Sequence, residues 1–89
     1  MSPVRFDRRG RYRLSPRVGL RSEPFGALAY HFDTRRLVFL KSTDLVDLVR
    51  SLDDHPTADA AIEAIDPARR SSFERALDSL VESGVVEAA

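Results

Sequence analysis

The side chains that could carry out acid–base or metal chemistry are few in this sequence of 89 residues. The absence of cysteine excludes disulfides, cysteine-bound zinc and thiol nucleophiles. The two histidines are His31 and His55. His31 lies in an alternating apolar run beside small alanines, which indicates a structural or surface role. His55 follows Asp53 and Asp54, but three neighbouring loop residues do not define a closed coordination shell. We therefore expect no metal site.

The acidic residues near the C-terminus do not form a catalytic pair. Glu74, Asp78 and Glu82 stand four residues apart, which places them on one exposed helix face, where solvation is their ordinary role. The sequence contains no glycine-rich phosphate loop, no Gly-x-Ser-x-Gly elbow and no His-Glu-x-x-His. A chain of this length buries only about 60–65% of its unfolded surface, which leaves little room for a water-excluding pocket. We expect a protein that is not an enzyme and uses no cofactor.

The net charge is zero, but the charges are distributed unevenly. Residues 1–41 hold ten basic and three acidic side chains, hence +7, and residues 42–89 hold four and eleven, hence −7. This asymmetry is compatible with a nucleic-acid arm, with attraction between the two halves of the fold, or with steering of an acidic partner. Residues 1–16 have only scattered apolar side chains, so we expect a flexible or loosely docked basic arm there and one domain over residues 17–89.

The sequence gives no sign of a membrane segment. No apolar stretch approaches the roughly 20 residues that span a bilayer, and the N-terminus lacks the apolar core of a signal peptide. The absence of cysteine also fits a reducing compartment. We expect a cytoplasmic protein with no membrane partner.

The first part of the predicted domain, residues 17–41, consists of strands that could position a binding site. Two-residue alternation predicts three strands, over residues 17–23, 27–32 and 36–41, and Pro24-Phe25-Gly26 supplies a turn between the first two. In the third strand, Leu37 and Phe39 fall on one face and Val38 and Leu40 on the other. Both faces of that strand should therefore be covered, either by the protein or by a partner.

Helical periodicity replaces the alternation from Ser42 onward. Ser42 or Thr43, Thr57 and Asp66 are the predicted caps of three helices. Their apolar stripes are Leu45, Leu48, Val49 and Leu52, then Ala58, Ala61, Ile62 and Ile65, then Phe73, Ala76, Leu77 and Leu80. Gly84 is a natural end for the third helix, after which Val85 and Val86 could form a short extended segment. The order predicts an α+β, winged helix-turn-helix-like fold in which a three-stranded antiparallel sheet precedes a three-helix bundle.

Two non-catalytic functions compete on this fold. A nucleic-acid-binding winged helix would read the groove with its third helix, but Arg69, Arg70 and Arg75 are offset there by acidic residues. We therefore expect no nucleic-acid partner and keep nucleic-acid binding as the alternative. Peptide capture by strand addition is favoured, because a three-stranded sheet has exposed edges. Edge-to-edge pairing of two copies through the same strand is a third possibility, so we expect a monomer or a weak homodimer.

Backbone pairing alone would not hold a peptide. About four hydrogen bonds, each contributing about 0.5–1.5 kcal/mol net, fall short of the roughly 8 kcal/mol of micromolar binding. Side-chain pockets are required, and on a helical wheel Arg70, Glu74, Leu77 and Val81 share one flank of the third helix. In the other interpretation, Leu77 and Val81 simply complete the core.

Three runs of the sequence carry a resemblance to a known family. They are Arg11-Tyr12-Arg13-Leu14-Ser15-Pro16-Arg17-Val18, Arg21-Ser22-Glu23-Pro24-Phe25-Gly26-Ala27-Leu28-Ala29-Tyr30-His31-Phe32 and Arg35-Arg36-Leu37-Val38-Phe39-Leu40-Lys41-Ser42. The chain resembles the peptide chaperones of mycofactocin systems. That family belongs to the precursor-peptide recognition domains of ribosomally made natural products and is similar to the pyrroloquinoline-quinone peptide chaperone.

The resemblance implies a winged-helix-like fold without catalytic residues. It also implies that a short precursor peptide binds through its leader as an added strand and is delivered to a radical S-adenosylmethionine maturase in the biosynthesis of a mycofactocin-type redox cofactor. The peptide-binding residues would be Arg36, Leu37, Val38, Phe39, Leu40 and Lys41 on the third strand and Arg70, Phe73, Leu77 and Val81 on the third helix.

Overall fold

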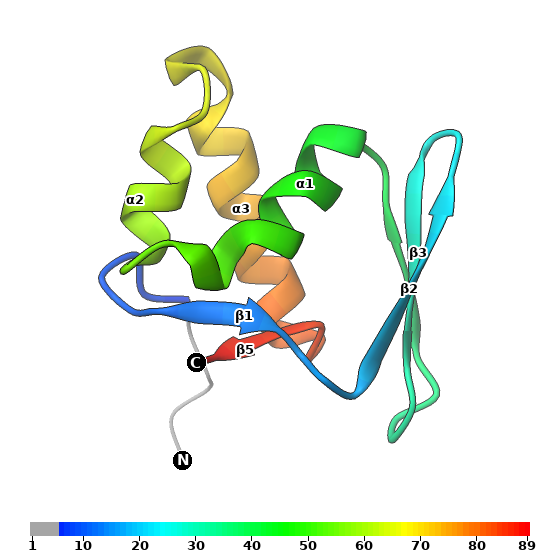
Figure 1. The fold of residues 1–89 in the computed structure, drawn as a ribbon. Helices are drawn as coiled ribbons and strands as arrows, with labels where there is room; N and C mark the ends of the chain where they lie inside the picture. Colours follow the sequence, from blue (N-terminus) through cyan, green and yellow to red (C-terminus); the bar gives the residue numbers. More distant parts are fainter. Residues whose placement is uncertain (1–5) are drawn as a thin grey trace.

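The structure, a computed structural model, describes residues 6–89. Its elements in chain order are β1 (Tyr12–Leu14), β2 (Val18–Glu23), β3 (Gly26–His31), β4 (Leu37–Leu40), α1 (Thr43–Ser51), the 3₁₀ turn η1 (Leu52–Asp54), α2 (Ala58–Glu63), the 3₁₀ turn η2 (Pro67–Arg69), α3 (Arg70–Glu82) and β5 (Val86–Ala88). The fold is α+β, with an antiparallel sheet in the order β2-β3-β4 and a separate antiparallel pair of β1 and β5. The helices lie on one side of the three-stranded sheet, which Figure 1 shows edge-on.

The three predicted central strands are confirmed to within one residue at each end. The turn between β2 and β3 depends on Gly26, whose φ is +151°. A Cβ at this position would overlap the carbonyl oxygen of Leu40 and stand 2.8 Å from the amide nitrogen of Ser42. Only glycine therefore allows the start of β3 to lie this close to the end of β4.

The predicted helix starts are also confirmed, each by a side chain that accepts a backbone N–H. Ser42 accepts from Leu45 at 3.3 Å and Thr57 accepts from Ala60 at 3.1 Å. Asp66 accepts from Ala68, but the residues that follow first form the 3₁₀ turn η2, and α3 begins only at residue 70. None of the described helices is long and apolar enough to cross a membrane.

The core lies between the helices and the inner face of the three-stranded sheet. All three predicted helix stripes contribute to it, and Ile65 and Ala76 are the stripe residues that are only partly buried. Helix α1 packs against β3 and β4. The inner-face residues Ala27 and Ala29 are fully buried, so their small side chains allow α1 to approach the sheet closely.

The described part of the predicted arm is docked on the fold. Tyr12–Leu14 form β1, which pairs with β5, and the Ser15 amide donates to the Val85 carbonyl at 2.9 Å. The carbonyls of Arg8 and Gly10 each accept an amide of α2 at 2.8 Å. These backbone bonds are long-range, so the local apolar pattern could not reveal them. Residues 1–5 of the predicted arm lie outside the described residues.

Candidate functional site

Among residues 6–89, β3 is the one strand that pairs with β4, so β4 forms an edge of its sheet. The His31 amide donates to the Arg36 carbonyl at 3.0 Å, just before β4 begins. In an antiparallel ladder, consecutive residues direct their backbone groups to opposite sides. The backbone N–H and C=O groups of Arg36, Val38 and Leu40 therefore point toward β3. Those of Leu37 and Phe39 point to the free edge. The fold thus presents two amides and two carbonyls that another strand could pair with.

The side chains of β4 divide as the alternation predicted. Leu40 is fully buried and Val38 is half-buried on the inner face, which α1 covers. Leu37 and Phe39 point to the outer face, and each is 57% exposed. The expectation that both faces are covered therefore holds for the inner face, while the described residues leave the outer face open (Figure 1).

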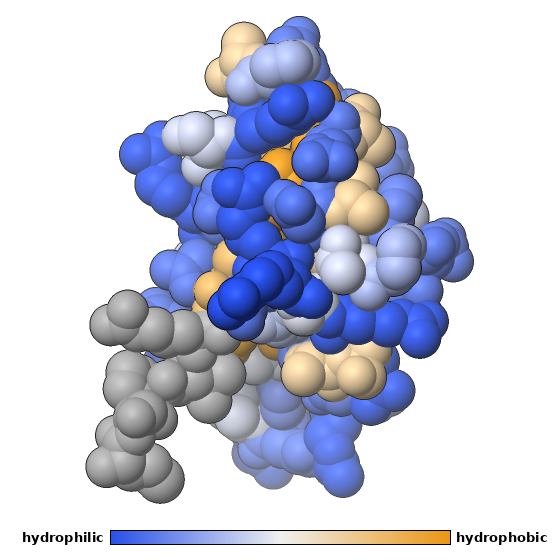
Figure 2. Space-filling view, turned by 90° about the vertical axis from the view of Figure 1, so that its left-hand side faces the viewer, coloured by the Kyte–Doolittle hydropathy of each residue, from blue (hydrophilic) through white to orange (hydrophobic). Residues whose placement is uncertain are grey.

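Five large apolar side chains form what we call the outer aromatic face: Phe25, Tyr30, Phe32, Leu37 and Phe39. They are the exposed large hydrophobic residues of the described chain. The rings of Phe25 and Phe39 lie 6.1 Å apart and those of Tyr30 and Phe32 lie 5.8 Å apart, measured between centroids. By contrast, the side of the molecule that carries α2 is mostly hydrophilic (Figure 2). A cluster of exposed rings on one sheet face is typical of an interaction surface.

Residue size in the sequence indicates that this face is exposed, but hydropathy alone does not. Alternation correctly separated Tyr30 and Phe32 from Ala27 and Ala29, yet gave no reason to place the larger residues outside. The clue is size: two alanines opposite a helix make room for close packing, and the aromatic residues must then occupy the other face.

Basic side chains flank β4 without ion-pair partners. Arg36 precedes the strand and Lys41 follows it, and both are exposed. Among the described residues, neither of them, nor Arg35, makes an ion pair, whereas Arg17 lies 2.9 Å from Asp33. A bound peptide would meet positive charge at both ends of this edge.

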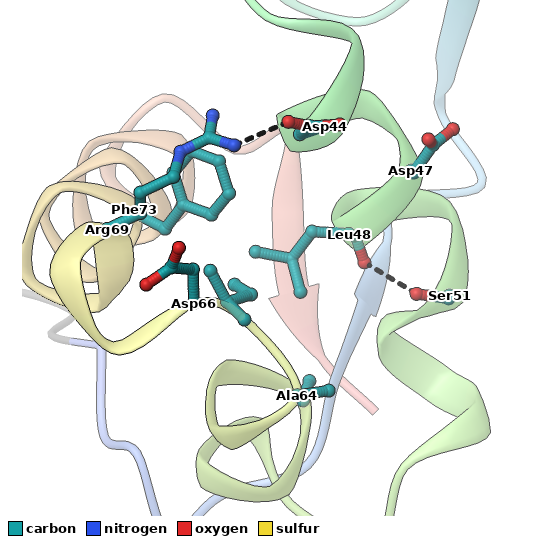
Figure 3. A pocket seen from close by; sticks show the side chains of 10 residues that line it. Asp44, Asp47, Leu48, Ser51, Ala64, Asp66, Arg69 and Phe73 are labelled. Atoms are coloured by element: carbon teal, nitrogen blue, oxygen red, sulfur yellow. Dashed lines mark hydrogen bonds and ion pairs between the residues drawn. The ribbon is translucent and has the colours of Figure 1, made fainter.

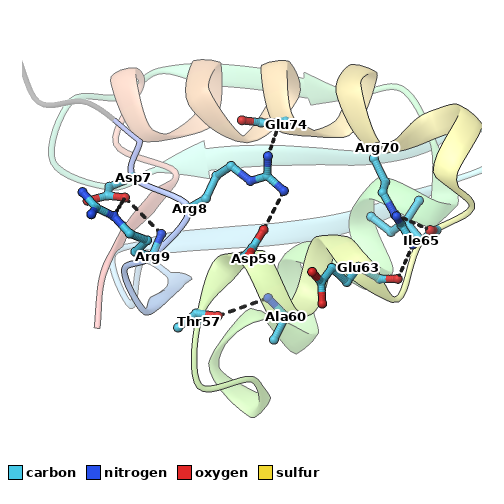
Figure 4. A network of polar contacts seen from close by, with 10 residues as sticks. All are labelled: Asp7, Arg8, Arg9, Thr57, Asp59, Ala60, Glu63, Ile65, Arg70 and Glu74. Atoms are coloured by element: carbon cyan, nitrogen blue, oxygen red, sulfur yellow. Dashed lines mark hydrogen bonds and ion pairs between the residues drawn. The ribbon is translucent and has the colours of Figure 1, made fainter.

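The structure places the three apolar residues predicted on α3 in the interior. Phe73, Leu77 and Val81 are all core residues, and Leu77 is fully buried. The Arg70 guanidinium donates to the carbonyls of Glu63 at 2.8 Å and of Ile65 at 3.0 Å, which ties α3 to the end of α2 (Figure 4). The interpretation in which Leu77 and Val81 complete the core therefore describes their packing. Leu77 and Val81 are 0% and 6% exposed, so they offer little surface to a ligand.

A cleft of about 320 Å³ lies between α1, α2 and the start of α3 (Figure 3). Leu48, Phe73 and Asp47 are among the residues that line it. The Arg69 guanidinium stacks 4.7 Å from the centroid of Phe73 and lies 2.6 Å from the Asp44 carboxylate. Since these contacts fix the start of α3 against α1, we assign the cleft a structural role.

The side chain of His31 has a structural role. The Nδ1 atom of His31 accepts the amides of Asp33 at 3.2 Å and Thr34 at 3.3 Å, which stabilises the turn between β3 and β4. His55 donates its backbone amide to Leu52 at the end of η1. Within residues 6–89, no cluster of three metal-ligating side chains is present.

Two arginines of the N-terminal segment form ion pairs with acidic residues of the C-terminal half, residues 42–89. Arg8 forms ion pairs with Asp59 and Glu74 (Figure 4), and Arg13 lies 2.7 Å from Glu87. The hydrogen bond from Arg13 lowers the pKa of the Glu87 carboxyl. Of the three interpretations of the charge asymmetry, attraction between the halves is therefore realised by these two arginines.

Comparison with known proteins gives a consistent result. The model of the peptide chaperone MftB family matches residues 11–87. Peptide chaperone MftB of Mycolicibacterium smegmatis is 44% identical over 85 residues, covering 93% of this chain and 83% of the relative. The protein of the same name from Mycobacterium ulcerans is 44% identical over 80 residues, covering 88% and 73%. That from Mycobacterium tuberculosis is 39% identical over 83 residues, covering 91% and 76%. No solved structure matches. The predicted resemblance is confirmed, and the chain belongs to the peptide chaperone MftB family.

Proposed function

We propose that this protein is a non-catalytic chaperone that binds a ribosomally made precursor peptide as an added strand on the free edge of β4. It then presents the peptide to a radical S-adenosylmethionine maturase in mycofactocin-type cofactor biosynthesis. The relatives named peptide chaperone support the peptide-binding role. The observation that carries strand addition is the free edge itself, with the outward backbone groups of Leu37 and Phe39. We further propose that the fold is winged-helix-like and that the protein acts in the cytoplasm as a monomer or weak homodimer.

The sheet has a second edge, on β2, and two features favour β4. The outward side chains of β4, Leu37 and Phe39, are apolar and exposed. Strand β2 instead carries exposed Arg21 and Ser22, and Arg21 is paired with Glu23 at 3.1 Å. Because side chains on neighbouring strands contact one another, an apolar peptide residue gains more beside β4 than beside β2.

The free energy of peptide binding indicates which side chains must contribute in addition to the backbone. About four backbone hydrogen bonds contribute about 0.5–1.5 kcal/mol each, against the roughly 8 kcal/mol of micromolar binding. More than half of the Leu37 and Phe39 side chains is open to a ligand. Burying on the order of 100 Å² on each would contribute about 2.5 kcal/mol apiece at 25 cal/mol per Å². These two side chains therefore provide what backbone pairing lacks.

The helix residues then have a supporting role in this proposal. Phe73, Leu77 and Val81 hold α3 in the core, and Arg70 fixes its start, so they act on the site by shaping the scaffold behind the sheet. Arg36 and Lys41 flank the peptide at the two ends of β4 and favour carboxylates there.

Titration of the precursor peptide into isotope-labelled protein, followed by amide NMR shifts, tests the proposal. The largest shifts are expected at Leu37 and Phe39, whose amides gain a hydrogen-bond acceptor. Amides of α2, on the hydrophilic side of the molecule, serve as the internal control. If saturating peptide moves amides elsewhere and leaves these two unchanged in the folded protein, strand addition at β4 is wrong.

A further inference from the structure

The outer aromatic face extends beyond the reach of a peptide on the β4 edge. Neighbouring strands lie about 4.8 Å apart, so an added strand would lie about 10 Å from β3 and contact chiefly Leu37 and Phe39. The Phe32 ring extends in the opposite direction, toward β2. A Cβ on Gly19 of that strand would stand 3.3 Å from the Cζ atom of Phe32. Tyr30 lies against Phe32, so both rings remain exposed when the edge is occupied.

The area of this face is large for a protein of 89 residues. When a peptide covers Leu37 and Phe39, roughly 300 Å² of this face stays open. In the free protein, with about 200 Å² for a fully exposed side chain of this size, the five residues expose roughly 500 Å². That value lies toward the upper end of the largest apolar patch on an ordinary monomer, about 300–600 Å². A specific protein–protein interface buries about 800 Å² on each partner. The outer aromatic face with a polar margin therefore has the dimensions of such an interface.

The charges around the face indicate the chemistry of the partner. Residues 17–41, which form the sheet and its turns, hold five basic and two acidic side chains, a net charge of +3. Arg17 and Arg21 are paired with the two acids. Arg35, before β4, and Lys41, directly after it, make no ion pair within the described residues. Arg36 is likewise without an ion pair there, but strand alternation places its side chain on the inner side with Val38 and Leu40. Arg8 and Arg13 of the N-terminal segment are used inside the fold. A two-fold dimer through this face would bring two equal positive margins together, which is unfavourable.

We propose that the outer aromatic face is the docking surface for a second protein, whose contact surface is apolar at its centre and carries carboxylates at its margin. The identity of that protein rests on the proposed function: it is the enzyme that receives the peptide. Leu37 and Phe39 belong both to this face and to the peptide edge. A peptide held on β4 thus lies along the border of the docked enzyme, which places it beside the partner that modifies it.

The test compares binding of the purified radical S-adenosylmethionine maturase and binding of the precursor peptide, each measured separately by calorimetry. Phe32→Ala is the main variant, because the ring is 56% exposed and its loss spares the core. We expect maturase affinity to fall at least tenfold, as when a large aromatic side chain of an interface is truncated, and peptide affinity to stay within twofold. Arg35→Glu should lower maturase affinity and reduce its dependence on salt. Arg75→Glu, an exposed charge reversal on α3, is the matched control and should leave both affinities unchanged.

The outcomes separate this inference from the proposed function. If Phe32→Ala binds peptide and maturase as the wild type does, the docking surface is wrong while the peptide site stands. If the wild type binds the maturase, Phe32→Ala weakens that binding and neither binds the peptide, the docking surface is supported and strand addition is wrong. Failure of the wild type to bind maturase, with or without peptide, overturns the inference. A concentration-dependent dimer that Phe32→Ala abolishes would also overturn it, because the occupant would be a second copy.

Discussion

Proline substitution on β4 should act in opposite ways at adjacent positions. Leu37 is the first residue of the strand and directs its N–H to the free edge. Proline is tolerated at the first residue of an edge strand, because the ladder loses no donor. At Val38, proline removes an amide that faces β3 and leaves a β3 carbonyl without its partner, which costs about 1–3 kcal/mol of folding stability. Leu37→Pro should therefore keep the fold, and Val38→Pro should weaken it.

Leu37→Pro should weaken peptide binding through two separate losses, that of the leucine side chain and that of the amide donor. Leu37→Ala removes most of a side chain that is 57% exposed in the free protein. At 25 cal/mol per Å² this change costs about 2 kcal/mol of peptide binding. Leu37→Pro additionally removes the amide donor and leaves a peptide carbonyl unpaired, about 1–2 kcal/mol more. The proline variant should bind about tenfold more weakly than the alanine variant.

Fluorescence anisotropy of a labelled precursor peptide measures these affinities, and chemical denaturation measures stability in parallel. Leu37→Ala controls for the lost side chain and Val38→Pro for the effect of proline on the sheet. The reasoning is refuted if Leu37→Pro is folded and binds peptide as tightly as Leu37→Ala, because the outward amide would then have no part in binding.

Three further predictions concern the scaffold. Gly26→Ala should destabilise the protein by about 2 kcal/mol or more, because the φ of +151° and the overlap with the Leu40 carbonyl both oppose a Cβ; an unchanged denaturation midpoint would contradict the turn geometry. Leu77→Ala should cost about 2–5 kcal/mol, as for a fully buried leucine, and a loss below about 1 kcal/mol would indicate a surface position. The lowered pKa of Glu87 means that its contribution to stability is present above the unfolded pKa of about 4.3 and is lost as the pH falls through the folded pKa. Glu87→Gln should accordingly flatten the dependence of folding stability on pH below that pH. Chemical denaturation at several pH values measures this dependence, and an unaltered dependence would exclude the Arg13 contact.

Local patterns were sufficient for the central strands and the helices. Two-residue alternation located β2, β3 and β4, and the caps Ser42 and Thr57 located the first two helix starts. These features depend on neighbouring residues, so the sequence displays them directly. Strand β1 escaped prediction because three residues carry too short a pattern and its partner β5 lies near the other end of the chain.

The sequence predicted those features of the candidate site that depend on neighbouring residues alone. The division of β4 into two faces followed from alternation, but which face meets the core depended on the fit of α1 against two alanines. Burial of Leu77 and Val81 likewise depends on the packing of α3 with elements distant in sequence. A helical wheel shows which residues share a flank, and it does not show what covers that flank.

Amide hydrogen exchange at single-residue resolution tests strand addition most directly. In the free protein, the amides of Val38 and Leu40 should be protected by their bonds to β3, and those of Leu37 and Phe39 should exchange rapidly from the open edge. On saturation with precursor peptide, Leu37 and Phe39 should become protected to a similar degree. If they continue to exchange rapidly in a complex known to be saturated, the peptide does not add to β4.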